Sequence, residues 1–283
     1  MMIVDAQVHV WAGGRRVTPA NAHHRQQPTF LKDELLREMD GAGVDRAILV
    51  PPSWDNNDHA LSAAAMHPDR FAVMARLRVD APGSRLLLQG LRSSSGALGV
   101  RLVFNAEHVH LLMDGAADWV WPIAEAEGIP IMMLAPSHLE RFGEIAKAHP
   151  QLRLIVDHMG LTRNQVGSEA FAHLPKLLEL AKYPNITVKA TGLPLHSAEA
   201  YPFRDLHEPL RRTIDAFGPE RVFWGTDLSR MTCTYRECVT FVTEAIDWLS
   251  PRDKELIMGE ALCRWLGWET ALADAAARAA PVS

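Results

Sequence analysis

Short apolar runs alternate with amphipathic segments along most of the chain. Eight of the apolar runs have the length and composition of buried strands. We predict strands over residues 3–10, 46–51, 71–77, 98–104, 129–135, 152–158, 185–191 and 221–227. The segments between them carry apolar residues at helical spacing, and several end in Gly or Pro, where helices commonly stop. Buried parallel strands read as nearly continuous apolar runs, so the pattern predicts an α/β fold.

The number of strands decides between two α/β architectures. Eight strands alternating with helices favour a (β/α)8 barrel, and 283 residues is an ordinary length for one. An open doubly wound sheet would need a Gly-rich phosphate loop after its first strand, and the stretch Trp11–Arg16 lacks that spacing. We therefore predict a single-domain TIM barrel over residues 1–270 and a peripheral C-terminal tail over residues 271–283.

The composition narrows the class of partner. Hydrophobic residues make up 48% of the chain, and the formal net charge is −5, so we expect neither a nucleic-acid nor a membrane partner. No apolar run approaches the roughly 20 residues that span a bilayer. The three cysteines have no disulfide or metal spacing, which favours the cytoplasm. We expect a cytoplasmic protein with a small-molecule substrate. The sequence does not decide between a monomer and a homodimer.

Polar side chains gather at the predicted C-terminal ends of the strands. Gln7 and His9 are two residues apart on a strand and therefore share a face. The other candidates at strand ends are Trp54, Arg101, His158 and Asp227, with Arg76 and Arg230 as weaker ones. Because the C-terminal ends of barrel strands carry active sites, we predict that these side chains meet in one pocket.

Each candidate also has an ordinary structural interpretation. Asp227 could cap the helix that follows it, and Arg101 could form a salt bridge inside the barrel. A histidine at a strand end is often a satisfied core residue, and Trp54 could simply pack in the core. The long loop after the seventh strand adds Tyr201 and Arg204 as candidates for gripping a substrate, although Arg204 could equally form a surface ion pair.

Several of these segments, in order, resemble the amidohydrolase superfamily. They include VDAQVHVW at the first strand, RLIVDHMGL at the sixth and RVFWGTDLS at the eighth. The first motif is the weakest taken alone, and the ordered set is the specific signal. The chain is most similar to the branch of pyrone-dicarboxylate lactonases, sugar lactonases and carboxymuconate-type decarboxylases. That resemblance implies a (β/α)8 barrel, hydrolytic or decarboxylating chemistry and often one divalent metal ion.

The chain departs from the family pattern where a metal would bind. The first strand has Gln7 in place of the first histidine of His-x-His and keeps the second as His9. The fifth strand offers Met132 and Met133 where many metal-using members have a histidine. If zinc or manganese bound, its ligands would be His9, His158 and Asp227, with Gln7 as a weak fourth donor. We expect no cofactor, with one divalent metal ion as the alternative.

The resemblance to metal-free lactonases assigns chemical roles to the retained residues. It implies that Asp227 activates water while His9 and His158 polarise the substrate carbonyl. Burial that raised the pKa of Asp227 would make it a stronger base. Gln7 can donate its amide N–H groups to an oxyanion, and Arg101 can clamp a carboxylate. Trp54, Tyr201 and Arg204 complete the expected substrate contacts.

The expected function is therefore metal-independent hydrolysis of a small cyclic ester or amide, in the manner of a lactonase. One alternative is a metal-dependent decarboxylase or hydratase of an unsaturated carboxylic acid. A second alternative is a barrel that binds a ligand without turning it over, which the replacement at Gln7 favours and the retained Asp227 argues against.

Overall fold

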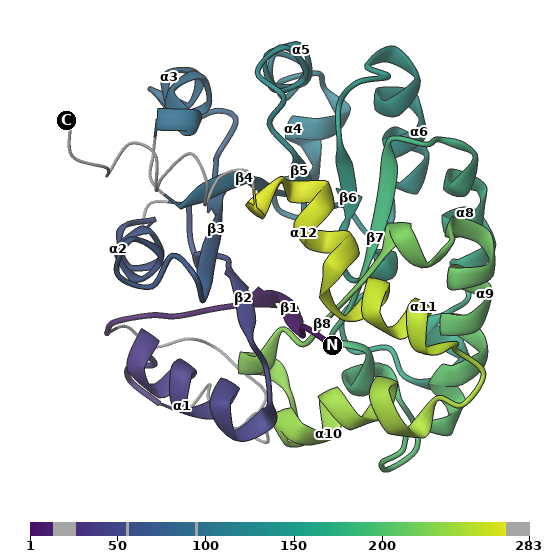
Figure 1. The fold of residues 1–283 in the computed structure, drawn as a ribbon. Coiled ribbons are helices and arrows are strands. Elements are labelled where there is room, and N and C mark those ends of the chain that lie inside the picture. The colour runs from purple at the N-terminus through teal and green to yellow at the C-terminus, as the bar shows by residue number, and fades with distance from the viewer. Residues whose placement is uncertain (14–26, 55–56, 94–95, 270–283) are drawn as a thin grey trace.

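Eight parallel strands, β1 to β8, lie side by side in chain order, and helices surround them (Figure 1). The computed structural model describes residues 1–13, 27–54, 57–93 and 96–269. The strands are β1 (Val4–Val8), β2 (Arg46–Leu49), β3 (Phe71–Arg76), β4 (Ala97–Val103), β5 (Ile131–Leu134), β6 (Leu154–Val156), β7 (Ile186–Thr191) and β8 (Val222–Gly225). All eight predicted strands are confirmed, with each end within two residues of its expected place.

Helices follow the strands in the alternating pattern that the sequence predicts. They are α1 (Lys32–Ala42), α2 (Asp58–Met66), α3 (Ser84–Gly90), α4 (Val109–Met113), α5 (Val120–Ala126), α6 (Leu139–Ala148), α7 (Gly167–Ala170), α8 (Leu174–Leu178), α9 (His207–Phe217), α10 (Tyr235–Thr240), α11 (Pro251–Glu255) and α12 (Ala261–Leu266). The predicted TIM barrel is confirmed. The expected tail over residues 271–283 lies outside the described residues, so its boundary stays a prediction. Within the described ranges, no helix is long and apolar enough to cross a membrane.

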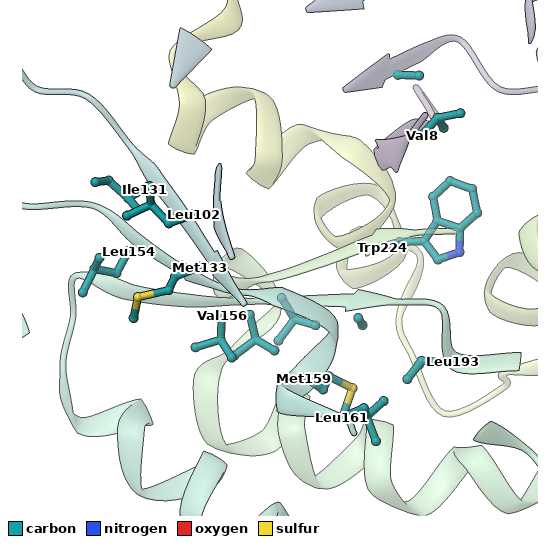
Figure 2. Close-up of a cluster of buried hydrophobic side chains, with 14 of the residues drawn as sticks. Val8, Leu102, Ile131, Met133, Leu154, Val156, Met159, Leu161, Leu193 and Trp224 are labelled. Atoms are coloured by element: carbon teal, nitrogen blue, oxygen red, sulfur yellow. The ribbon is translucent and has the colours of Figure 1, made fainter. Parts of the chain in front are cut away.

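The apolar residues of every strand except β7 divide between two buried clusters. In β5, Ile131 and Met133 belong to the large cluster that Figure 2 draws, whereas Met132 between them belongs to a second cluster. In β6, Val156 and Ile155 divide in the same way. Successive strand residues point to opposite faces, so the large cluster lies between strands and helices and the second fills the barrel interior.

Helix α12 closes the N-terminal end of the barrel, and it crosses in front of the strands in Figure 1. Its residues Leu262 and Leu266 share the interior cluster with Val4, Leu98 and Phe223, which lie at the first or second positions of their strands. Burial of such side chains stabilises the fold by about 1.5–3 kcal/mol each. This end of the barrel is therefore apolar and filled, which leaves polar groups to the opposite end.

A bulge in β1 sets the direction of its polar side chains. The register of β1 against β2 shifts between Asp5 and Val8. Strict alternation would place Asp5 on the same face as Gln7, but the bulge breaks that alternation. Asp5 instead faces the seam with β8, where its carboxylate accepts a hydrogen bond from Thr226 N at 2.9 Å. Gln7 is left pointing into the barrel.

The seam between β1 and β8 requires a very close approach of the two strands. The amide of Asp227 donates to the carbonyl oxygen of Gln7 at 2.9 Å. At Gly225, a Cβ atom would lie 2.7 Å from the backbone nitrogen of Ala6, closer than any side chain tolerates. A glycine at this position lets the barrel close and brings the end of β8 against β1.

Candidate active site

A pocket of about 670 Å³ opens at the C-terminal ends of the strands. Five of the predicted site residues line it together: Gln7, His9, Arg101, His158 and Asp227. The pocket also takes in Arg76, Phe104, Asn105, Leu134, Ser137, His138, Leu161, Arg163, His196 and Arg230. The structure thus brings side chains from β1, β4 and the ends of β6 and β8 to one cavity, as strand-end geometry requires.

Asp227 and His9 form a buried pair at one side of this pocket. His9 Nδ1 lies 2.6 Å from the carbonyl oxygen of Val50, an acceptor, so Nδ1 carries a hydrogen. His9 Nε2 then lies 3.0 Å from Asp227 Oδ1. Burial acts to raise the pKa of Asp227, but the hydrogen bond and charge of His9 outweigh it and hold that pKa well below its usual range. Asp227 is therefore a carboxylate at neutral pH, and its pKa is not lifted toward neutrality.

His158 is a neutral ring with one fixed tautomer. Its Nδ1 lies 2.7 Å from Thr191 Oγ1, whereas its Nε2 lies 3.3 Å from Arg101 Nη2 and 3.4 Å from Gln7 Nε2. Both of the latter atoms are donors, so Nε2 accepts and Nδ1 carries the hydrogen. Burial, with Lys189 and Arg101 nearby, lowers the pKa of His158 to about 3 despite two carboxylates close by.

Two side chains of the pocket stand on backbone that non-glycine residues rarely adopt. His158 has φ 51° in the short helix η3 (Asp157–Gly160), and Asp227 has φ 55° just before η8 (Leu228–Arg230). The left-handed region costs an L-residue of order 1 kcal/mol or more. Both positions lie two residues beyond the end of a strand, so the turn aims each side chain across the barrel mouth instead of along the strand.

A second buried carboxylate, Asp157, is held by two basic side chains. Arg101 Nε donates to Asp157 Oδ2 at 2.6 Å, and Lys189 Nζ lies 2.7 Å from Asp157 Oδ1. Burial acts to raise the pKa of Asp157, but the charges of Arg101 and Lys189 outweigh it and the pKa lies below its ordinary value. Arg101 therefore has the interior salt bridge that its position allowed, and only its outer edge faces the pocket.

The pocket is rich in positive charge. Among the described residues that line it, four are arginines and one, Asp227, is a carboxylate. Arg230 Nη1 lies 3.3 Å from Asp227 Oδ2. Arg163 is exposed at the rim of the pocket, and partial desolvation together with the nearby charge of Arg230 lowers its pKa. Arg163 gave no signal in the sequence because it lies on a loop beyond the end of β6.

Three predicted substrate contacts do not line this pocket. Trp54 is 41% exposed and lines a smaller adjoining cavity, where the guanidinium of Arg78 lies over its ring at 5.2 Å. Tyr201 is 40% exposed, and its hydroxyl donates to Thr240 Oγ1 at 3.0 Å. Arg204 is exposed at the start of a short helical turn. None of these three side chains lines the pocket around Asp227.

Comparison with known families decides the identity of the barrel. The family model described as Amidohydrolase matches residues 4–275. The chain belongs to this amidohydrolase family. The resemblance seen in the sequence is confirmed, and the protein is a hydrolytic enzyme.

Two curated relatives and one solved structure show how this amidohydrolase compares with known members. It is 35% identical over 241 residues to L-fucono-1,5-lactonase of Burkholderia ambifaria, and the match covers 79% of each chain. It is 24% identical over 229 residues to 4-sulfomuconolactone hydrolase of Hydrogenophaga intermedia, with 79% of this chain and 73% of the relative covered. A crystal structure of an amidohydrolase from Burkholderia multivorans with bound zinc has a TM-score of 0.80 at 20% identity, over 94% of this chain and 99% of that one.

The zinc in that relative raises the question of whether this amidohydrolase has suitable ligands. The amide nitrogen of Gln7, which cannot ligate a metal, faces the Nε2 atoms of both His9 and His158 at 3.4 Å. Across the described ranges, no three or more His, Cys, Asp or Glu side chains are grouped to hold a metal ion. The donor set present around Asp227 therefore does not fit a divalent cation.

Proposed function

We propose that this amidohydrolase hydrolyses a small cyclic ester that carries an anionic group, without a metal ion. The observation that carries the proposal is the ionised Asp227 at the pocket, 3.0 Å from His9. A carboxylate that stays charged at neutral pH is ready to accept a proton from water, and general-base catalysis contributes about 10²–10⁴-fold to rate. The match to two lactone-hydrolysing relatives supports the same reaction class.

The proposed reaction opens the lactone in two proton transfers. Asp227 takes a proton from water as the water oxygen bonds to the carbonyl carbon. The amide N–H of Gln7 stabilises the resulting oxyanion, while His9 holds the carboxylate of Asp227 in place. The ring C–O bond then breaks, and Asp227 returns the proton to the leaving oxygen, which gives a hydroxy acid.

His158 has a different task in this scheme from the one that the resemblance implies. Its Nε2 accepts from Arg101 and Gln7, so it has no hydrogen to give a carbonyl oxygen from that side. The neutral ring instead accepts from Gln7 and Arg101 through Nε2 and so orients these two donors. Thr191 fixes the tautomer through its contact with Nδ1, on the other side of the ring.

The charge of the pocket supports the anionic group on the substrate. Arg76, Arg163 and Arg230 line the same cavity as Asp227, and guanidinium groups suit carboxylates and other planar anions. One charge-assisted hydrogen bond contributes about 1.5–3 kcal/mol, which corresponds to roughly tenfold or more in affinity.

A panel of lactones tests the proposal. Paired five- and six-membered lactones, with and without a carboxylate substituent, are incubated with the enzyme, and hydroxy-acid release is followed by proton release and NMR. We expect turnover that a chelator leaves unchanged, with kcat/KM at least about tenfold higher for the carboxylated member of each pair. Carbon dioxide release from unsaturated carboxylic acids, dependent on added zinc or manganese, would instead establish the decarboxylase. Binding of the lactones without any turnover would establish a silent barrel.

A further inference from the structure

Lys189 is a fully buried cation in the centre of the barrel. It lies on β7 with no exposed surface, and its Nζ reaches three other elements. The ammonium lies 2.7 Å from Asp157 Oδ1, donates to Gln7 Oε1 and lies 3.4 Å from Met132 Sδ. Buried lysines are rare because removing an ammonium from water is costly, so these contacts need a reason beyond packing.

The charges around Lys189 do not cancel. Asp157 is shared with Arg101, whose Nε donates to its other oxygen at 2.6 Å. Burial lowers the pKa of Lys189, and the charges of Asp157 and Asp227 oppose that shift and favour the ammonium form. Two basic side chains thus share the carboxylate of Asp157. A divalent cation placed beside Gln7 and His158 would be repelled through a poorly screened interior.

Lys189 also decides which end of Gln7 faces the pocket. An ammonium group has three donors and no acceptor, so it can bind only the oxygen of the amide. The nitrogen of Gln7 must then point away from Lys189, toward the Nε2 atoms of His9 and His158. The same contact therefore removes the one oxygen with which Gln7 could ligate a metal and presents an N–H donor in its place.

We propose that Lys189 is a resident cation that replaces a divalent metal in this barrel, by orienting Gln7 as a hydrogen-bond donor and by excluding metal ions from the histidines. Lys189 is a positioning residue, because it acts through Gln7. The catalytic part of this inference rests on the proposed lactone hydrolysis, whereas the exclusion of metal stands independently of it.

Metal binding of the full-length protein tests the inference without a substrate. The wild type, Gln7→His, Lys189→Met and the double variant Gln7→His/Lys189→Met are dialysed against zinc or manganese, and bound metal is measured by elemental analysis and calorimetry. We expect the double variant to bind about one equivalent, at least about 10- to 100-fold more tightly than Gln7→His alone. Methionine keeps the length and apolar character of the stem, and Asp157 retains Arg101 as its countercharge.

Lys189→Arg, placed in the Gln7→His background, is the matched control. It keeps the cation, so we expect it to bind metal as weakly as Gln7→His alone. If the double variant with methionine fails to fold, Lys189→Gln in the same background replaces it. The inference is overturned if Gln7→His binds metal as tightly as the double variant. It is equally overturned if the wild type binds an equivalent of zinc or manganese at micromolar concentration.

Activity provides a separate readout. Lys189→Met is expected to lower kcat on a lactone by about 10-fold or more with little change in KM. Gln7 would stay in the pocket, but its amide would no longer be held in one orientation. Lys189→Arg is expected to recover part of that loss. A metal-binding result as expected, together with no turnover by the wild type, would refute the proposed function and leave the exclusion of metal intact.

Discussion

Asp157 and Asp227 stand at corresponding places in the barrel yet differ in almost every chemical respect. Each lies one or two residues beyond the C-terminal end of a strand, and each is almost completely buried and ionised. Asp157 is held by Arg101 and Lys189, and it does not line the pocket. Asp227 faces the pocket beside the imidazole of His9, and Arg230 Nη1 lies 3.3 Å from its other oxygen.

The difference shows that burial and strand-end position do not by themselves identify a base. A carboxylate held by two basic side chains, such as Asp157, has little basicity left, and its role is to stabilise the fold. A carboxylate paired with an imidazole and open to the pocket can move a proton. The partners of each carboxylate, rather than its place in the fold, separate the two roles.

The largest effect is expected from Asp227→Asn. The amide cannot accept the proton of the attacking water, so kcat on a lactone should fall by about 10²–10⁴-fold. The measurement is the initial rate of acid release under saturating substrate. The thermal unfolding midpoint should stay close to that of the wild type. Turnover within about threefold of the wild type would contradict the assignment of Asp227 as the base.

Asp157→Asn should show the opposite pattern. Removing this charge leaves Arg101 and Lys189 buried without a countercharge, which typically costs about 3–5 kcal/mol. The free energy of unfolding, measured in urea by circular dichroism, should fall by that amount. Asp227→Asn should cost clearly less, because its partners His9 and Arg230 both line the pocket, where solvent reaches them. Equal destabilisation by the two substitutions would contradict the structural role assigned to Asp157 and the catalytic role assigned to Asp227.

A third buried carboxylate, Asp5, extends the comparison to a group that has no cation beside it. Burial raises its pKa to about 6, although Thr226, Gln7 and Tyr235 all donate hydrogen bonds to it. The folded state therefore holds the proton of Asp5 more tightly than the unfolded state, where the pKa is 3.8. The contribution of Asp5 to stability is fully present below about pH 4 and is lost as the pH rises through about 6.

The substitution Asp5→Asn tests this sign. A shift of about two pKa units corresponds to roughly 3 kcal/mol, so the stability of the wild type relative to Asp5→Asn should decline by about that much between pH 4 and pH 7. Urea titrations of both proteins across this range give the difference directly. A difference that rises with pH would show that the hydrogen bonds to Asp5 outweigh its burial.

The sequence predicted the barrel and most of the pocket for a common physical reason. The interior strands must be apolar, so Gln7, Arg101 and His158 stand out against their neighbours, and parallel strands bring their ends together. Hydrophobic periodicity cannot reveal which side chains contact each other across the barrel. Lys189 and Gln7 are 182 residues apart in sequence, and their contact depends on the closed geometry.

Two further features lay beyond a pattern-based prediction. The bulge in β1 separates Asp5 from Gln7, although strict alternation would keep them together. The positions of Tyr201 and Arg204 depend on the path of a long loop, which hydrophobic periodicity does not fix. Arg163 escaped notice for the same reason.

The smallest expected effect separates the arginines of the pocket from those of the surface. Arg163 lines the pocket, where its charge attracts an anionic lactone, so Arg163→Gln should raise KM for a carboxylated lactone by about tenfold and leave kcat unchanged. Its effect should shrink as salt is added, because the arginine is near the solvent. A neutral lactone should show no change in KM.

Arg204→Gln is the matched control for that measurement, since Arg204 is exposed and does not line the pocket. If the two substitutions raise KM equally, the loop after β7 reaches the substrate, and the sequence-based assignment of Arg204 is confirmed. If only Arg163→Gln raises it, the anion is recognised inside the pocket, on the same side of the barrel as Asp227. The pattern of KM values would then place the charged group of the substrate relative to its reacting carbonyl.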